Sequence, residues 1–140
     1  MSVRKNDQRP SSFGPLDTSL KLITHTFNIL SNEKVFIPRY QKFIDKIAAE
    51  TAMIYHKCRV ANKLYMRATD PEELKANIRR RLTLQREALE LIEDLNSDIM
   101  ISQKLFHLKA SKVRYWTELT VEAERAIAAW HKSDKTKYGS

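Results

Sequence analysis

Among the side chains that could bind a ligand or catalyse a reaction, arginine and lysine form the clearest clusters in this 140-residue sequence. Three consecutive arginines occupy positions 79–81, and Arg86 follows Arg79 by seven residues, which places those two on one face of a helix. Guanidinium and ammonium groups bind phosphates through charge-assisted hydrogen bonds. A helical surface of this kind holds the backbone of a nucleic acid and reads little of its sequence.

Basic residues of the preceding segment are expected to join this surface, because an antiparallel hairpin would bring the two segments together. Residues 39–86 contain 12 Lys or Arg and 5 Asp or Glu, whereas residues 87–98 contain 5 acids and no base. The alternative is a solvated surface with ion pairs along each helix, the usual role of exposed charge. We predict nucleic-acid contacts by Lys57, Arg59, Lys63, Arg67, Arg79, Arg80 and Arg86.

Three further residues are expected to be structural or to lie at a subunit interface. Arg81 falls close to the apolar face of its helix, so its guanidinium needs a carboxylate, a backbone carbonyl or a partner subunit. The helical spacing of Trp116 and Trp130 predicts core or interface anchors. Tyr55 and Tyr65 lie near the basic cluster and have rings that stack on bases, but their spacing fits the core better.

Patterns for catalysis or cofactor binding are sparse. The only glycines are Gly14 and Gly139, so a glycine-rich phosphate loop is excluded, and no histidine has a metal-binding spacing. Cys58 falls on an apolar stripe and is expected to be buried and unreactive. We therefore predict no enzymatic activity, no metal and no cofactor. One alternative is a HEPN-like ribonuclease, because Arg125 and His131 have the loose Arg-x(4–6)-His spacing, although six helical steps align them poorly.

The overall composition agrees with a polyanion partner. The sequence has 25 Lys or Arg against 17 Asp or Glu, a net charge of +8, and a pI near 9.7. No run of 18 apolar residues occurs, which predicts no membrane span, and the first ten residues lack the apolar core of a secretory signal. Together with a single cysteine, these features predict a cytoplasmic protein.

The spacing of apolar residues predicts an all-α fold, an up-down-up-down four-helix bundle within residues 16–134. Residues 1–15 are expected to form a flexible polar arm and residues 135–140 a basic tail. The first helix should bury the stripe Leu16, Leu20, Ile23, Phe27 and Leu30. The later helices should run from Pro38 to about Arg67, from a Thr69 or Asp70 cap to about Ile101, and onward from a Ser102 cap.

Several soft motifs carry a family resemblance. They are an aromatic-aliphatic first helix, residues 37–43 (IPRYQKF), Arg81 with residues 85–89 (QREAL), residues 101–104 (ISQK) and residues 130–134 (WHKSD). In this layout the stretch from Leu16 to Asp134 resembles the accessory variability determinant (Avd) proteins of diversity-generating retroelements. Those proteins belong to a wider group of bacterial four-helix bundles that includes proteins encoded in ribosomal RNA intervening sequences.

The resemblance implies a non-catalytic basic homopentamer that binds the retroelement reverse transcriptase and its template RNA. Their complex makes adenine-mutagenised cDNA, which diversifies a target gene in a process called mutagenic retrohoming. The first alternative is a related bundle of the intervening-sequence type with an undetermined scaffold role, and the second is the HEPN-like ribonuclease.

Overall fold

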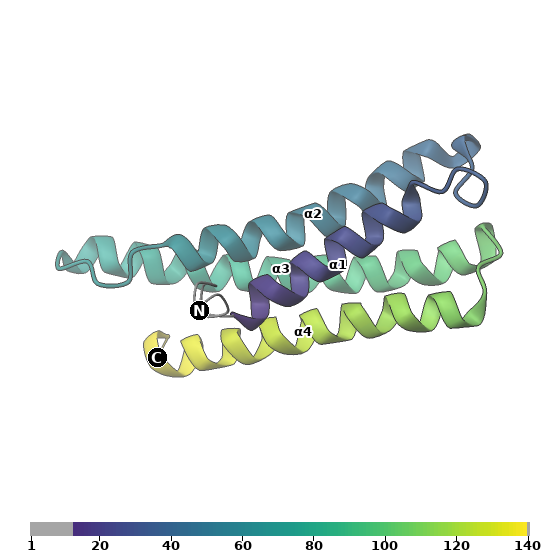
Figure 1. The fold of residues 1–140 in the computed structure, drawn as a ribbon. Coiled ribbons are helices and arrows are strands. Elements are labelled where there is room, and N and C mark those ends of the chain that lie inside the picture. Colours follow the sequence, from purple (N-terminus) through teal and green to yellow (C-terminus); the bar gives the residue numbers. More distant parts are fainter. Residues whose placement is uncertain (1–12, 140) are drawn as a thin grey trace, which may run out of the picture.

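The structure is a computed structural model that describes residues 13–139, and these form four long α-helices (Figure 1). Within the described residues there is no strand, so the predicted all-α class is confirmed. No helix in this part of the chain is both long and apolar enough to cross a membrane. The elements are α1 (Gly14–Leu30), η2 (Pro38–Tyr40, a 3-10 turn), α2 (Gln41–Lys63), α3 (Pro71–Leu105) and α4 (Ala110–Tyr138).

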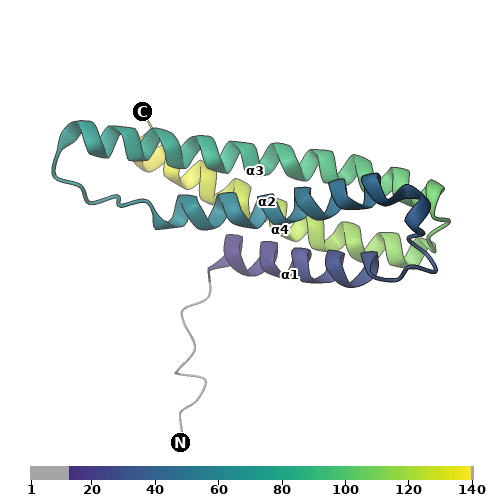
Figure 2. The same cartoon turned by 90° about the horizontal axis from the view of Figure 1, so that it is seen from above.

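Successive helices run in opposite directions in both ribbon views (Figures 1 and 2). Each helix packs on two others, since α1 contacts α2 and α4, and α3 contacts α2 and α4. The connections 31–40 and 106–109 therefore meet at one end of the bundle, which we call the loop end. The end of α2, the connection 64–70 and the start of α3 form the opposite end, which we call the hairpin end.

The hairpin end projects beyond α1 and α4, as both ribbon views show. Helix α3 has 35 residues, against 23 in α2 and 29 in α4, so its first turns extend past the C-terminal end of α4. None of residues 69–84 is buried, and Gln85 is the first buried residue of α3. The tip is therefore held by helix geometry and by its own connection more than by the core.

The start of α3 agrees with the sequence, whereas its end does not. Asp70 is the N-cap and accepts a hydrogen bond from the Glu73 backbone N–H at 3.1 Å, as one of the two predicted caps. The predicted Ser102 cap is wrong, because Ser102 is buried inside α3, and α4 begins only after Lys109. The buried face of α3 continues through Ser102, so packing carries the helix four residues further than expected.

The end of α3 is set by His107, which adopts a φ of 56°. This left-handed conformation follows the last helical turn, and the Leu108 N–H donates back to the Gln103 carbonyl at 3.1 Å. Glycine is the residue that usually takes this position, because any Cβ is strained there. Helix α2, in contrast, ends at Lys63, which is earlier than the predicted Arg67.

The helices also extend into the predicted flanking segments. Gly14 and Pro15 belong to α1, with Pro15 buried, although both were expected in the arm. Phe13, from the same predicted arm, is the N-cap of α1 and packs against the core. Residues 1–12 of that arm lie outside the described residues. At the other end α4 continues to Tyr138, so residues 135–138 of the predicted tail are helical.

The inward face of α1 is offset by one residue from the predicted stripe. Leu20 and Phe27 are 46% and 47% exposed, while Ser19, Leu22 and Thr26 are buried, so the prediction is wrong for Leu20 and Phe27. Leu30 is buried and Leu16 packs against the core, as predicted. The Ser19 hydroxyl donates to the Pro15 carbonyl at 2.6 Å, and the Thr26 hydroxyl accepts the Trp116 indole N–H at 3.0 Å. With their polar atoms paired in this way, both side chains are buried at little cost.

An ionic cluster lies between α2 and α3, nearer the loop end. The Lys46 ammonium donates to Glu50 at 2.7 Å and to Asp98 at 2.5 Å, and these two carboxylates are 8% and 5% exposed. The second oxygen of Glu50 is buried and has no partner among the described residues. Burial, with the nearby Asp98 adding to it and Lys46 opposing it, raises the pKa of Glu50 to about 7.

This shifted pKa predicts a pH-dependent stability that Glu50→Gln removes. The folded state binds the Glu50 proton more tightly than the unfolded state, so the contribution is fully present below pH 4.5 and is lost as the pH rises through about 7. As the pH rises from 5 to 8, we expect the free energy of unfolding of E50Q to increase relative to that of the parent protein. Urea unfolding at the two pH values measures this change. Glu90→Gln, at an exposed position of α3, is the control. If the unfolding free energies of E50Q and the parent protein differ by the same amount at pH 5 and at pH 8, the raised pKa of Glu50 is contradicted.

Candidate nucleic-acid interface

Six of the seven predicted contact residues have exposed side chains at the hairpin end or on the adjoining turns of α2 and α3. They come from both arms of the projecting hairpin and from its connection. Because α1 and α4 stop short of the tip, an extended polyanion has access to it from several sides. The six are Arg59, Lys63, Arg67, Arg79, Arg80 and Arg86.

Lys57 differs from the other six. Its side chain is only 22% exposed, and its ammonium donates to the Glu87 carboxylate at 3.0 Å across the α2–α3 interface. The charge of Lys57 is therefore committed to holding the two helices together. Arg86 lies 3.9 Å from Glu90, but both side chains are more than half exposed, so this pair is weak and leaves Arg86 accessible.

Tyr65 adds an aromatic ring to the hairpin end. Its backbone carbonyl accepts a hydrogen bond from the Asn77 side-chain amide at 2.8 Å, which ties the connection to the second turn of α3. The Tyr65 side chain is 60% exposed, so its assignment to the core is wrong, whereas Tyr55 is partly buried. An exposed ring among cations is the arrangement on which an unpaired base stacks.

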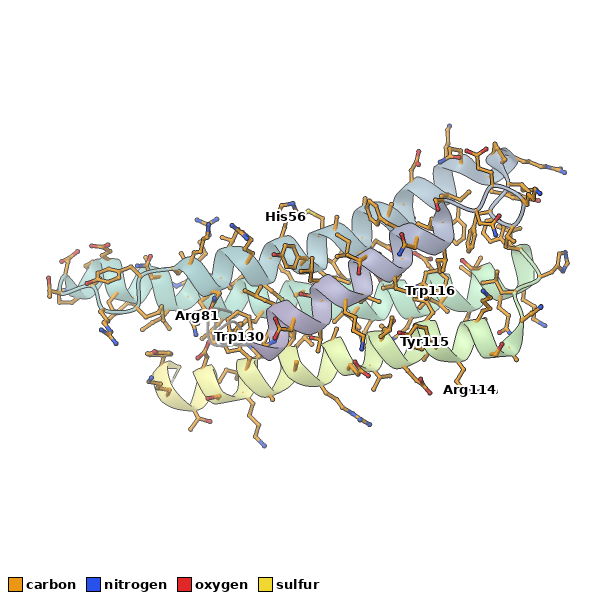
Figure 3. All side chains as sticks on the ribbon, in the orientation of Figure 1. His56, Arg81, Arg114, Tyr115, Trp116 and Trp130 are labelled. Atoms are coloured by element: carbon orange, nitrogen blue, oxygen red, sulfur yellow. The ribbon has the colours of Figure 1, made fainter. Side chains whose placement is uncertain are left out.

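Arg81 turns inward between α3 and α4, beside Trp130 (Figure 3). Its carboxylate partner is Asp134. The Nε atom donates to Asp134 at 2.6 Å, and the guanidinium carbon lies 5.2 Å from the centre of the Trp130 ring. Asp134 is 5% exposed, and Trp130, 9% exposed, also meets the Phe13 ring edge-on at 5.1 Å. Arg81 thus joins the two helices at the base of the hairpin, with only 14% of its side chain exposed.

Gln85 and His131 extend the Arg81–Asp134 pair into a chain of hydrogen bonds. Gln85 is fully buried and donates its amide to Asp134 at 2.7 Å, so its oxygen faces His131 Nδ1 at 2.7 Å. Nδ1 must then carry the proton. Burial, with Lys135 and Arg86 adding to it, lowers the pKa of His131. The imidazole is therefore neutral at pH 7 and serves as a hydrogen-bond donor within the structure.

The residues of the ribonuclease alternative are not joined. His131 uses Nδ1 for Gln85, and Arg125 is exposed on α4, with no hydrogen bond or ion pair between them within residues 13–139. In the same part of the chain, no three His, Cys, Asp or Glu side chains are grouped to hold a metal ion. Cys58 is buried as predicted, and burial raises the pKa of its thiol to about 12.

The loop end is a second basic region that the sequence-based prediction did not include as a site. Residues 31–45 and 104–114 meet there and contain seven Lys or Arg against two acids. The sequence already indicates part of this region, because residues 99–115 contain four bases and no acid. Only the fold adds the bases of the first connection, because the Phe36 ring packs on Phe106 at 4.5 Å. The seven are Lys34, Arg39, Lys42, Lys104, Lys109, Lys112 and Arg114.

Comparison with known proteins adds no relative. No protein-family model, no curated protein and no solved structure matches this chain.

Proposed function

We propose that this protein is a non-catalytic, basic four-helix bundle of up-down-up-down topology that binds RNA through its hairpin end. One observation carries the proposal: six exposed cations gather on a projecting hairpin, and the neighbouring Lys57 and Arg81 are already paired internally. Exposed cations attract phosphates, and phosphate binding releases counterions. Tyr65 supplies an accessible ring for an unpaired base, which favours single-stranded RNA.

We further propose that the protein acts as an accessory subunit of a diversity-generating retroelement. In this role it assembles as a homopentamer and binds the reverse transcriptase with its template RNA during mutagenic cDNA synthesis. The resemblance of residues 16–134 to Avd proteins supports this role, and the basic surface meets its electrostatic requirement. Five copies would each contribute a net charge of +8 to one RNA-binding assembly.

Replacing Arg79 and Arg80 with alanine tests the RNA site. Each lost phosphate contact should reduce the dependence of log K on log[salt] by about 0.7 for a single strand, so the double variant should bind about tenfold or more weakly with a slope smaller by about 1.4. The measurement is fluorescence anisotropy with a labelled single-stranded RNA across a salt series. Both side chains are exposed, so folding should be preserved.

A matched double variant separates a local site from general charge. Lys104→Ala with Arg114→Ala removes the same two charges from exposed positions toward the loop end. We expect it to retain most of the affinity. Equal losses in both double variants would reject the hairpin end as the site. Co-purification with a reverse transcriptase from the same locus tests the accessory role, and a 16.4 kDa monomer in solution would contradict the pentamer.

A further inference from the structure

The loop end contains a cavity of about 630 Å³ that the proposed RNA site does not use. Its walls come from α1, from both connections at this end and from the start of α4. Small-molecule sites in proteins have volumes of about 300–1,000 Å³, so this cavity is large enough for a compact ligand. It lies at the opposite end of the bundle from Arg79 and Arg80.

The lining of the cavity is cationic and contains no acid. Lys109 and Lys112 lie on one wall with Ser111 between them, and no aspartate or glutamate is among its lining residues. Both lysines have exposed side chains, and neither is in an ion pair with another described residue. Lys109 is the N-cap of α4, and Lys112 lies in its first turn. This wall therefore favours an anionic group such as a phosphate.

Aromatic and amide side chains contribute a second part of the lining. Tyr115 is 46% exposed and meets the His25 ring edge-on at 4.9 Å, while Trp116 lies deeper, at 1% exposure (Figure 3). The Tyr115 ring is thus a supported surface on which a planar group stacks. Asn28, on α1, carries both a donor and an acceptor for the edge of a nucleobase, and Asn32, just after α1, offers its amide donor, since its Oδ1 accepts the Lys34 backbone N–H at 3.1 Å.

His107 also lines this cavity, in the left-handed conformation that ends α3. Glycine would relieve the strain at this position, so the imidazole is present at a cost in stability. A side chain held at such a cost beside a cationic cavity is a candidate ligand contact. It also offers a variant in which stability and binding are expected to change in opposite directions.

From these observations we infer that the cavity binds a nucleoside 5′-phosphate. Lys109 and Lys112 hold the phosphate, Tyr115 stacks on the base, and Asn28 with Asn32 meets the base edge. The same chemistry is present in a free nucleotide and in the 5′-phosphorylated end of an RNA strand. The inference stands apart from RNA binding at the hairpin end and would survive its failure.

Calorimetric titration with the four nucleoside 5′-monophosphates, with adenosine and with inorganic phosphate tests the inference. At least one monophosphate should bind more tightly than both adenosine and phosphate. Lys109→Ala with Lys112→Ala should weaken its binding about tenfold or more, because two charged contacts are lost. Tyr115→Ala should weaken nucleotide binding while leaving inorganic phosphate unchanged. His107→Gly should raise the melting temperature and weaken binding.

Lys104→Ala with Arg114→Ala is the matched control, since it removes two charges near the same end from residues that do not line the cavity. It should change affinity less than about twofold, as expected for a screened surface charge. The inference is overturned if none of the four monophosphates binds, or if both double variants lose affinity equally. The two sources are distinguished in the Arg79→Ala/Arg80→Ala background by comparing 5′-phosphorylated with 5′-hydroxyl RNA. A preference for the phosphorylated strand assigns the cavity to RNA ends, and binding of mononucleotides alone assigns it to free nucleotides.

Discussion

Arg81→Ala is expected to lower the free energy of unfolding by about 3–5 kcal/mol, the usual effect of removing one partner of a buried ion pair. The substitution leaves the Asp134 carboxylate, 5% exposed, with Gln85 as its remaining partner. It also removes the cation from above the Trp130 ring, which adds a smaller loss. Urea unfolding followed by circular dichroism, at a fixed protein concentration, measures the change.

Arg80→Ala is the matched control for this prediction. It removes the same side chain one position earlier, where the arginine is exposed, and should change stability by about 0.5 kcal/mol or less. Replacing the pair together, with Arg81→Met and Asp134→Asn, should recover much of the lost stability, because no buried charge is left unpaired and the new amide oxygen still accepts the Gln85 N–H. Equal effects of the Arg81 and Arg80 substitutions would show that the ion pair does not stabilise the fold.

Trp116→Ala should lower the free energy of unfolding by about 3–5 kcal/mol, because it empties a large volume in the core. Trp116 is 1% exposed and packs near Phe36, whose ring lies 6.4 Å away, at the level where α1 meets α4. Its indole N–H also donates to the Thr26 hydroxyl at 3.0 Å, so truncation leaves a buried hydroxyl without its partner. The same urea unfolding experiment measures the loss.

A double-mutant cycle isolates the hydrogen bond from the packing. Trp116→Phe and Thr26→Val each leave one buried polar group unpaired and should each cost about 1–3 kcal/mol. The double variant removes both polar groups, so it should cost less than the sum of the two single changes. Strict additivity would mean that the hydrogen bond contributes nothing to stability. Exposed Tyr115→Phe, next in sequence, controls for aromatic substitution in α4.

The sequence predicted that Arg81 needs a buried acceptor but did not identify which residue provides it. An arginine near an apolar seam needs a buried acceptor, and that much follows from desolvation alone. Asp134 is 53 residues away and lies within a run that reads as a solvated, basic helix end. Which of 17 acids turns inward depends on the crossing of α3 and α4, which local spacing does not encode.

Hydroxyl side chains explain where the apolar pattern failed. Ser19 and Thr120 donate to the carbonyl one turn earlier, at 2.6 and 2.9 Å, so they pack in the core without an unpaired donor. A reading based on apolar residues therefore placed Leu20 and Phe27 inward, one step from the buried face. Ser102 differs from these two: it is buried within α3 instead of capping α4, and its hydroxyl has no hydrogen-bond partner among the described residues. By contrast, the Asp70–Pro71 start was predictable, because local chemistry alone defines it.

The unburied tip of the hairpin end can unfold locally while the rest of the bundle stays folded. Its backbone hydrogen bonds can open while the buried residues around Ile92 stay packed, because none of residues 69–84 contributes a buried side chain. The free energy of such a local opening is far smaller than that of unfolding the whole bundle. A bound partner can therefore reshape the turns that precede Arg79, while the ion pair between Arg81 and Asp134 anchors the helix from that point on. The bundle acts as a fixed base, and the tip adapts to what it contacts.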